Sequence, residues 1–210
     1  MHKNTRFGMV QGRLTQSPSG RLQWFPQEAW QDEFEIASDL GINYIELIAE
    51  VQHNKNNPIW TNDGIGQIKQ LVKKNDLTLH ALCNDYIVEH SFLDEDVIQQ
   101  NIDLIEQEKK LGIEKYIMPF FESSELSANN MQDYVEPLKR VSKVAYSGNI
   151  TVCLETILTG QELIKLLKLI DLPNVKVVYD TGNRVAFGHD LASDIRLLSD
   201  YIAHVHIKDK

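Results

Sequence analysis

The sequence predicts an α/β fold, a (β/α)8 TIM barrel that is truncated after its seventh strand. Three observations support this fold class. Short β-rich segments alternate with longer segments of helical period along all 210 residues, which is typical of parallel strands joined by helices. Several strands place polar side chains at every second position, as expected for strands that line a barrel interior. No strand is followed by GxGxxG or GxxxxGK(S/T), which disfavours the commonest nucleotide-binding folds.

Seven segments are predicted as strands, and the seventh shows the alternation clearly. There, Ala203, Val205 and Ile207 point to one face of the strand. Ile202, His204 and His206 point to the other. The predicted strands are 8–14, 44–47, 77–83, 116–120, 150–156, 175–181 and 202–209.

Six helices are predicted between these strands. The first has Pro26 in its first turn and Gly41 as its stop, and the third is an amphipathic run from Val97 to Leu111 that Gly112 ends. The other four are 62–73, 131–147, 161–170 and 191–199. Pro137 is expected to kink or restart the helix over 131–147, because proline removes a backbone donor.

The length of the chain is short for a closed barrel. Seven strands in 210 residues give 30 residues per unit, whereas a complete barrel has about 250 residues. We therefore expect one domain over 1–210 that lacks an eighth strand and two helices, with the first and seventh strands left with unpaired edges. On this interpretation the sequence is part of a longer protein or is completed by another chain.

Composition and charge exclude several classes of protein. Thirty acidic residues against 21 basic ones give a formal net charge of −9, which disfavours nucleic acid as a partner. Cys83 and Cys153 lie in apolar segments and are expected to be reduced thiols. The first residues contain no apolar run that would form a signal peptide or a membrane anchor. We expect a cytoplasmic protein without a membrane partner, and a homo-oligomer is left open.

Glu155, Asp180 and His206 are the main candidates for chemistry. Each stands at or near the carboxyl end of a predicted strand, at intervals of 25 and 26 residues along the chain. On neighbouring barrel strands, two carboxylates and an imidazole would form a ligand set for a divalent ion such as Mn²⁺, Mg²⁺, Co²⁺ or Zn²⁺. Taken singly, each has another interpretation, because a carboxylate after a strand often caps a helix and a strand histidine is often a hydrogen-bonded core residue.

Several stretches in this order make the sequence similar to a known family. They are QGRL at 11–14, followed by Phe25, Pro26, Trp30, Glu33 and Phe34, then IEL at 45–47, LET at 154–156, YDTGN at 179–183 and HVHIKD at 204–209. Through them the chain resembles the xylose isomerase-like TIM-barrel superfamily, especially its sugar phosphate isomerase/epimerase branch. The resemblance runs the length of the chain.

The resemblance implies a metal site and a reaction. It implies that Glu155, Asp180 and His206 hold a divalent ion, with a fourth ligand, a Glu of the eighth strand, beyond residue 210. The implied reaction is isomerisation or epimerisation of a sugar or sugar phosphate through an enediolate, with Glu155 as the catalytic base. Because the eighth-strand Glu is also the natural second acid/base, we expect residues 1–210 alone to have little turnover.

Five further residues are candidates for binding the small-molecule sugar. Glu46 and His80 are expected to end the second and third strands, where each could bind hydroxyl groups or serve as an interior hydrogen-bonding residue. Asn183 falls where several epimerases carry a histidine, but it is equally a turn residue. Arg184 and Lys208 could meet a phosphate or carboxylate, or be surface charges.

Three aromatic residues of the first third of the chain have two possible roles. Trp24, Phe25 and Trp60 either cover the mouth of the pocket or pack between the early loops and helices.

An inosose-type dehydratase would share the same ion and enolate chemistry. An endonuclease IV-like phosphodiesterase is disfavoured by the negative charge and by Asn183 in place of the histidine of a D-x-x-H pattern. An inactive sugar-binding fragment is the alternative without catalysis.

Overall fold

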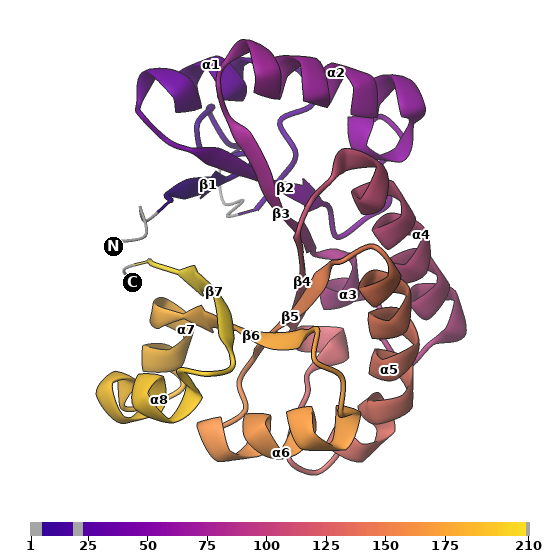
Figure 1. Ribbon diagram of the computed structural model, residues 1–210, viewed down its shortest axis with the longest axis vertical. Coiled ribbons are helices and arrows are strands. Elements are labelled where there is room, and N and C mark those ends of the chain that lie inside the picture. Colours follow the sequence, from indigo (N-terminus) through magenta and orange to yellow (C-terminus); the bar gives the residue numbers. More distant parts are fainter. Residues whose placement is uncertain (1–5, 19–22, 209–210) are drawn as a thin grey trace.

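A computed structural model describes residues 6–18 and 23–208, and its centre is one parallel sheet of seven strands in chain order. The strands are β1 (Gly8–Val10), β2 (Tyr44–Ala49), β3 (Thr78–Asn84), β4 (Lys115–Phe120), β5 (Thr151–Thr156), β6 (Val175–Asp180) and β7 (Ile202–His206). The sheet curls around an interior and stays open between β1 and β7, while helices surround its outer side (Figure 1). The predicted α/β barrel with seven strands is therefore confirmed as an incomplete barrel.

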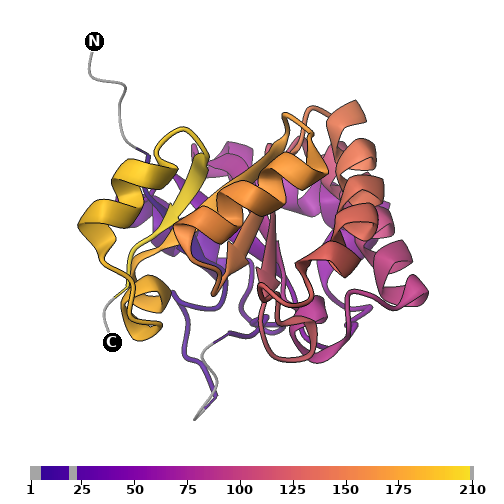
Figure 2. The same ribbon diagram turned by 90° about the horizontal axis from the view of Figure 1, so that it is seen from below.

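Eight α-helices and two short 3-10 helices are assigned within the described residues. The α-helices are α1 (Asp32–Asp39), α2 (Asn62–Lys74), α3 (Tyr86–Glu89), α4 (Glu95–Leu111), α5 (Met131–Ser147), α6 (Gly160–Ile170), α7 (Thr181–Ala186) and α8 (Leu191–Leu198). The 3-10 helices are η1 (Pro58–Trp60) and η2 (Glu122–Ser124). Figure 2, seen from below, shows α6 lying along the outer side of the strands, next to α5.

The start of the first helix, the end of the first strand and the course of the helix around Pro137 show the effect of local structure on the predictions. The first helix begins at Asp32 and not near Pro26, because the backbone between them forms turns, with Ala29 N–H bonded to the Pro26 carbonyl. The first strand ends at Val10, since Gly12 turns the chain with a φ of +86°. The helix α5 runs through Pro137 without restarting, which leaves only the kink of the two predicted effects. Buried side chains on both sides of the proline, including Tyr134 and Leu138, hold the helix against the sheet.

Two apolar layers stabilise the barrel. The larger layer fills the space between the outer face of the sheet and the helices, with fully buried side chains such as Phe34, Leu47 and Leu166. The smaller one lies on the inner face and contains Ala81, Cys83, Ile117, Cys153 and Val178. Both cysteines are buried free thiols, and burial raises the pKa of Cys153 to about 12. The inner layer forms an apolar floor beneath the polar residues at the carboxyl ends of the strands.

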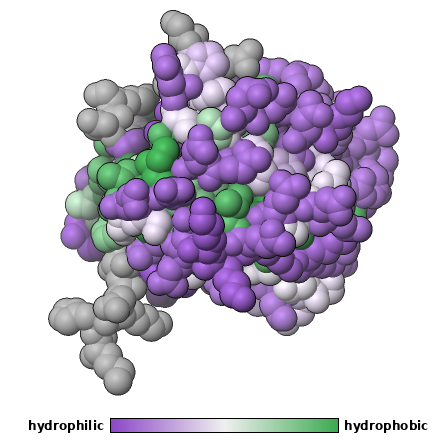
Figure 3. Space-filling model, turned by 90° about the horizontal axis from the view of Figure 1, so that it is seen from above, coloured by the Kyte–Doolittle hydropathy of each residue, from purple (hydrophilic) through white to green (hydrophobic). Residues whose placement is uncertain are grey.

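The gap between β1 and β7 leaves apolar side chains uncovered. Among the described residues no further strand pairs with the outer edge of either strand, as expected. Val205, which lies on the outer face of β7 beside the buried Tyr179 of β6, is 49% exposed, and Ile207 is 80% exposed. Next to β1, Phe7 is 62% exposed. Figure 3 shows hydrophobic surface gathered on the side of the molecule that carries the gap.

None of the helices in the described ranges is both long enough and apolar enough to span a bilayer.

Candidate metal centre

Glu155, Asp180 and His206 come together at the carboxyl ends of three neighbouring strands. Glu155 is the fifth residue of β5, and Asp180 and His206 are the last residues of β6 and β7. His206 Nδ1 lies 3.5 Å from Glu155 Oε2 and 3.7 Å from Asp180 Oδ2. The two acidic residues are almost completely buried, with exposed fractions of 6% and 1%. The structure thus produces the convergence that the spacing along the chain predicts.

The strand register explains why these side chains meet. Asp180 pairs with His206, and Val178 pairs with His204 one layer below. Because alternate residues of a strand face the same side, all four of these side chains point into the barrel. On β5, Cys153 belongs to the inner apolar layer, and Glu155 lies two residues further along the same face. Each site residue therefore stands directly above an inward-facing residue of its own strand.

The donor set fits a divalent cation. One ligand atom from each of the three residues lies within 4.8 Å of the others, and together they offer two carboxylate oxygens and one imidazole nitrogen. Asp180 Oδ2 is buried and receives no well-aligned hydrogen bond from the described residues. Its nearest positive groups are Lys208 Nζ at 2.5 Å and His206 Nδ1 at 3.7 Å. A buried carboxylate oxygen that faces only cationic groups marks a place where positive charge is needed.

Charges within the site shift the pKa values of its members. Burial works against the charged form of Asp180, but the nearby side chains of His206 and Lys208 and the hydrogen bond from the Asn183 backbone outweigh it and hold the pKa of Asp180 well below its ordinary value. Burial likewise disfavours the charged imidazolium, but Glu46, Asp180 and Glu155 raise the pKa of His206 well above its ordinary value. Both shifts have the same physical cause, which is that the buried carboxylates of the centre favour positive charge beside them.

Asn183 contacts both acidic residues of the centre. Its side-chain Nδ2 donates to Glu155 Oε1 at 2.6 Å. Its backbone N–H donates to Asp180 Oδ1 at 2.8 Å, so Asp180 also caps the amino end of α7. Asn183 thus lies in the first turn of α7, in agreement with the turn interpretation, and its amide holds the Glu155 carboxylate in place. A contact between Asn183 and the substrate stays a prediction.

Glu46 and His80 do not end their strands, and that expectation is wrong for both. Glu46 is the third residue of β2, which continues to Ala49, and its carboxylate accepts from His204 Nε2 at 2.9 Å. Burial alone would raise the pKa of Glu46, but the His206 and His204 imidazoles lower it to about 2. His80 is the third residue of β3, which continues to Asn84. Both strands continue past these residues through apolar positions, which are Leu47–Ala49 in β2 and Ala81–Cys83 in β3.

His80 lies in the amino-terminal half of the barrel. Its Nδ1 is 3.2 Å from Glu114 Oε2, and its ring packs edge-on against Tyr44, with the ring centres 5.0 Å apart. Burial and the positive charge of Lys115 lower the pKa of His80 to about 4. Its side chain therefore serves as an interior polar residue away from the predicted metal ligands.

The structure does not bring Arg184 to the centre, although a substrate-binding role is predicted for it. The side chain is buried; its Nε lies 2.6 Å from Asp194 Oδ2, and its Nη1 donates to the Leu158 carbonyl at 2.6 Å. The guanidinium thus joins α7 to α8 and to the loop after β5. We correct the prediction for Arg184, because a guanidinium held on both sides by the protein offers no free face to a substrate anion.

Two further acidic residues lie at the carboxyl side of the barrel: Asp85 was missed in the sequence, and Glu33 was named only among the residues that carry the family resemblance. Asp85 directly follows β3; it is 2% exposed, and its Oδ1 accepts from the Cys83 thiol at 3.3 Å. Burial raises the pKa of Asp85 to about 7. Glu33 of α1 accepts backbone bonds from Gly12 at 2.9 Å and from Leu14 at 3.1 Å. Asp85 would have been found if the third strand had been extended to its observed end.

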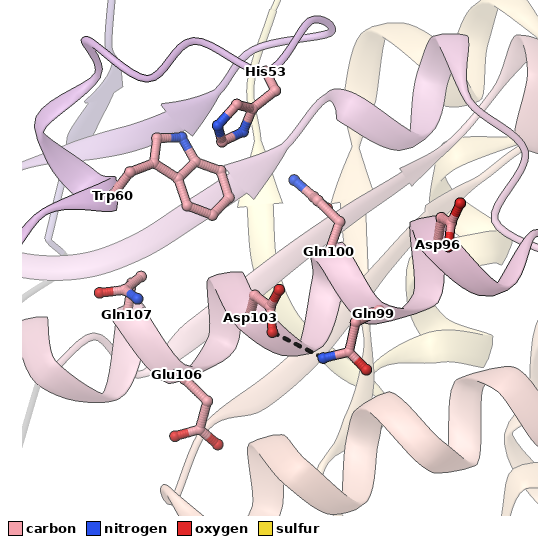
Figure 4. A pocket seen from close by; sticks show the side chains of 8 residues that line it. All are labelled: His53, Trp60, Asp96, Gln99, Gln100, Asp103, Glu106 and Gln107. Carbon is pink, nitrogen blue, oxygen red and sulfur yellow. Dashed lines mark hydrogen bonds between the residues drawn. The ribbon is translucent and has the colours of Figure 1, made fainter.

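The aromatic residues near the first loops have separate places. Phe25 is buried in the outer core, and Trp24 Nε1 donates to the Gly12 carbonyl at 2.9 Å. Trp60 packs against His53, with ring centres 4.8 Å apart, in a groove of about 470 Å³ between η1 and α4. Figure 4 shows the polar side chains of α4, such as Gln100 and Asp103, facing this pair. The groove contains none of the predicted metal ligands, so Trp60 agrees with the packing interpretation. Phe25 agrees with it as well, because it is buried in the core.

Fold and centre together define a parallel α/β barrel with acidic and imidazole groups at the carboxyl ends of its strands. The chain belongs to the xylose isomerase-like TIM barrel family, whose family model matches residues 34–210.

Individual proteins of known description are also similar to the chain. Inosose dehydratase of Clostridium tetani (strain Massachusetts / E88) is 30% identical over 97 residues, which are 43% of this chain and 33% of that enzyme. The chain thus matches about a third of the length of that curated relative.

Two solved structures are similar over nearly the whole chain. D-psicose 3-epimerase from Clostridium cellulolyticum H10, solved with D-tagatose, has a TM-score of 0.74 at 20% identity, covering 96% of this chain and 72% of its own. A xylose isomerase-like TIM barrel protein from Mycobacterium smegmatis, solved in complex with magnesium, has a TM-score of 0.74 at 14% identity, covering 97% and 74%. At these identities the likeness shows a shared fold.

Proposed function

We propose that the chain forms the main part of a divalent-metal-dependent isomerase or epimerase of sugars or sugar phosphates. The observation that carries this proposal is the meeting of Glu155, Asp180 and His206 within 4.8 Å at the carboxyl ends of adjacent strands. In barrels of this kind the carboxyl ends of the strands are where active sites are built. The sugar epimerase among the structural neighbours fits this reaction class.

The residues of the centre have distinct roles in the proposed reaction. A bound ion would supply positive charge where the oxyanion of an enediolate develops. Glu155 takes the proton next to the substrate carbonyl with Oε2, while Asn183 fixes Oε1 through the 2.6 Å hydrogen bond. Burial of the carboxylates excludes water and strengthens these charge interactions. Lys208, whose Nζ lies 2.5 Å from Asp180 Oδ2 and whose side chain is 48% exposed, would contact an anionic or hydroxyl group of the substrate.

The proposal also assigns a role to the gap between β1 and β7, the two edge strands of the sheet. We place an eighth strand in the gap between β1 and β7, from the same or another chain, where it would cover exposed Val205 and Ile207. That strand would provide the fourth ligand and the second acid/base. On this proposal the described residues include the base, Glu155, and three of the four metal ligands. Exchange of a substrate proton should therefore need less of the protein than full turnover does.

Proton exchange is therefore the test of the proposed function. The chain is incubated with Mn²⁺ in D2O with a panel of ketoses and ketose phosphates that includes D-psicose and D-tagatose. Proton NMR should show deuterium incorporation at the carbon next to the carbonyl for at least one of them. The incorporation should stop when EDTA removes the metal. No exchange on any sugar by the Mn²⁺-loaded chain would contradict the proposal.

A dehydratase is the second candidate, and the sequence relative favours it. Both reactions begin with abstraction of the proton next to a carbonyl, but a dehydratase then expels a hydroxyl group as water. Mass spectrometry of the same incubations separates them, because epimerisation leaves the substrate mass unchanged and dehydration gives a product lighter by one water molecule.

A further inference from the structure

Glu46 connects the metal centre to the interior of the barrel. Glu46 belongs to β2, and the two histidines that its carboxylate approaches belong to β7. These two strands lie on different sides of the barrel interior (Figure 1). His204 and His206 stand two residues apart on the inward face of β7, and both approach the Glu46 carboxylate. His204 Nε2 lies 2.9 Å from Oε2, and His206 Nε2 lies 3.2 Å from Oε1. The hydrogen bond of His206 Nε2 is to Oε2, at 3.4 Å. Glu46 is thus shared by two imidazoles below the predicted ligand layer.

The two nitrogens of His206 face different groups. Nδ1 faces Glu155 and Asp180, at 3.5 and 3.7 Å, whereas Nε2 faces only the Glu46 carboxylate among the acidic groups described. An imidazole that binds a metal must present a lone pair on one nitrogen, and its other nitrogen usually donates to a carboxylate or carbonyl. Glu46 has the position and the chemistry of that acceptor.

We propose that Glu46 is a positioning residue that holds the Nε2–H of His206 and thereby directs Nδ1 to the metal ion. The inference rests on the proposed metal-dependent function and adds a residue to its site. His204 completes the arrangement, because its hydrogen bond to Oε2 fixes the carboxylate that in turn fixes His206. A strand on one side of the barrel thus sets the ring orientation of a ligand on another.

This role explains the burial of Glu46 better than the two alternatives do. A substrate-binding role needs an accessible oxygen, but Glu46 is only 2% exposed and both of its oxygens face imidazoles. A second ion could in principle use the group Glu46, His204 and His206. The 2.9 Å between Glu46 Oε2 and His204 Nε2 is a hydrogen-bond length, whereas two ligands around a tetrahedral ion with bonds of about 2.0–2.1 Å lie about 3.3 Å apart.

Metal affinity gives the first measurement. Glu46→Gln keeps the shape of the side chain and Glu46→Leu removes the acceptor, and Mn²⁺ binding is measured by calorimetry after circular dichroism has established the fold of each variant. The expected loss of affinity is about 10-fold to 100-fold, larger for Glu46→Leu. Glu114→Gln is the matched control, because Glu114 also contacts a histidine, His80, at 3.2 Å but outside the two clusters, and it should bind as wild type does.

Histidine NMR gives a readout that a merely structural role would not change. In wild-type protein labelled with 15N-histidine, Nε2 of His206 should carry a slowly exchanging proton before and after addition of Zn²⁺, and Nδ1 should show the coordination shift. In Glu46→Leu the Nε2 proton should exchange rapidly. The wild-type spectrum keeps the test valid even if a variant fails to fold.

Three results would overturn the inference. They are an Nε2 without a proton in the wild type, unchanged Mn²⁺ affinity in folded Glu46 variants, or two ions per wild-type chain with one lost in Glu46→Gln. Failure of the proposed function looks different, because the wild type itself would then bind no ion while the hydrogen bond between Glu46 and His206 Nε2 remained observable.

Discussion

Glu155→Gln is expected to lower the rate of metal-dependent proton exchange by about 10²–10⁴-fold, which is the range for loss of a positioned general base. The substitution retains an oxygen that can accept the 2.6 Å hydrogen bond from Asn183, so the side chain should keep its place. It removes the basic oxygen that faces His206 and Asp180 and also weakens the ion site. The measurement is deuterium incorporation by NMR at saturating Mn²⁺.

The control for this experiment is Glu136→Gln, which neutralises an exposed carboxylate of α5 far along the chain from the centre. It should exchange the substrate proton at the wild-type rate. A folded Glu155→Gln protein whose rate at saturating metal equals that of the control would remove Glu155 from the reaction.

Asp194→Ala is expected to lower the free energy of unfolding by about 3–5 kcal/mol, because it leaves the guanidinium of Arg184 buried without its counter-charge. The side chains of this pair are only 4% and 8% exposed, and the arginine also bonds the Leu158 carbonyl. Since α7 begins directly after Asp180, loosening this contact should also weaken metal binding. Urea denaturation of the metal-free protein measures the first effect without the second.

Two comparisons make this prediction specific. The double replacement Arg184→Met with Asp194→Leu removes both charges and should recover most of the lost stability. Glu95→Ala breaks the ion pair of Glu95 with Arg140, whose side chains are 68% and 48% exposed, and should change the stability far less. Equal effects of Asp194→Ala and Glu95→Ala would show that burial does not govern the Arg184 pair.

Much of the fold could be predicted from the sequence because its signals are local. Alternation of strand and helix patterns predicts seven parallel strands in chain order, and the structure has that order. The short helices α3 and α7 were not expected, since each is too brief to show a helical period and follows directly on the end of a strand. The observed ends of β2 and β3 also depend on pairing with neighbouring strands, which no local pattern reveals.

The site could be predicted in part for a similar reason. Glu155, Asp180 and His206 converge because parallel neighbouring strands bring their carboxyl ends to one edge, and spacing along the chain reflects this. The position of Glu46 beneath them depends on contact across the barrel with His206, 160 residues away. The partner of Arg184 is likewise set by how α8 packs against α7, so its burial could not be seen in the sequence.

Metal binding by ligand variants tests the central claim most directly. The wild-type chain should bind one Mn²⁺, and Asp180→Asn and His206→Gln should each weaken that binding by at least about 100-fold while circular dichroism shows an unchanged fold. Wild-type Mn²⁺ affinity in either folded variant would contradict a single ion held jointly by Glu155, Asp180 and His206.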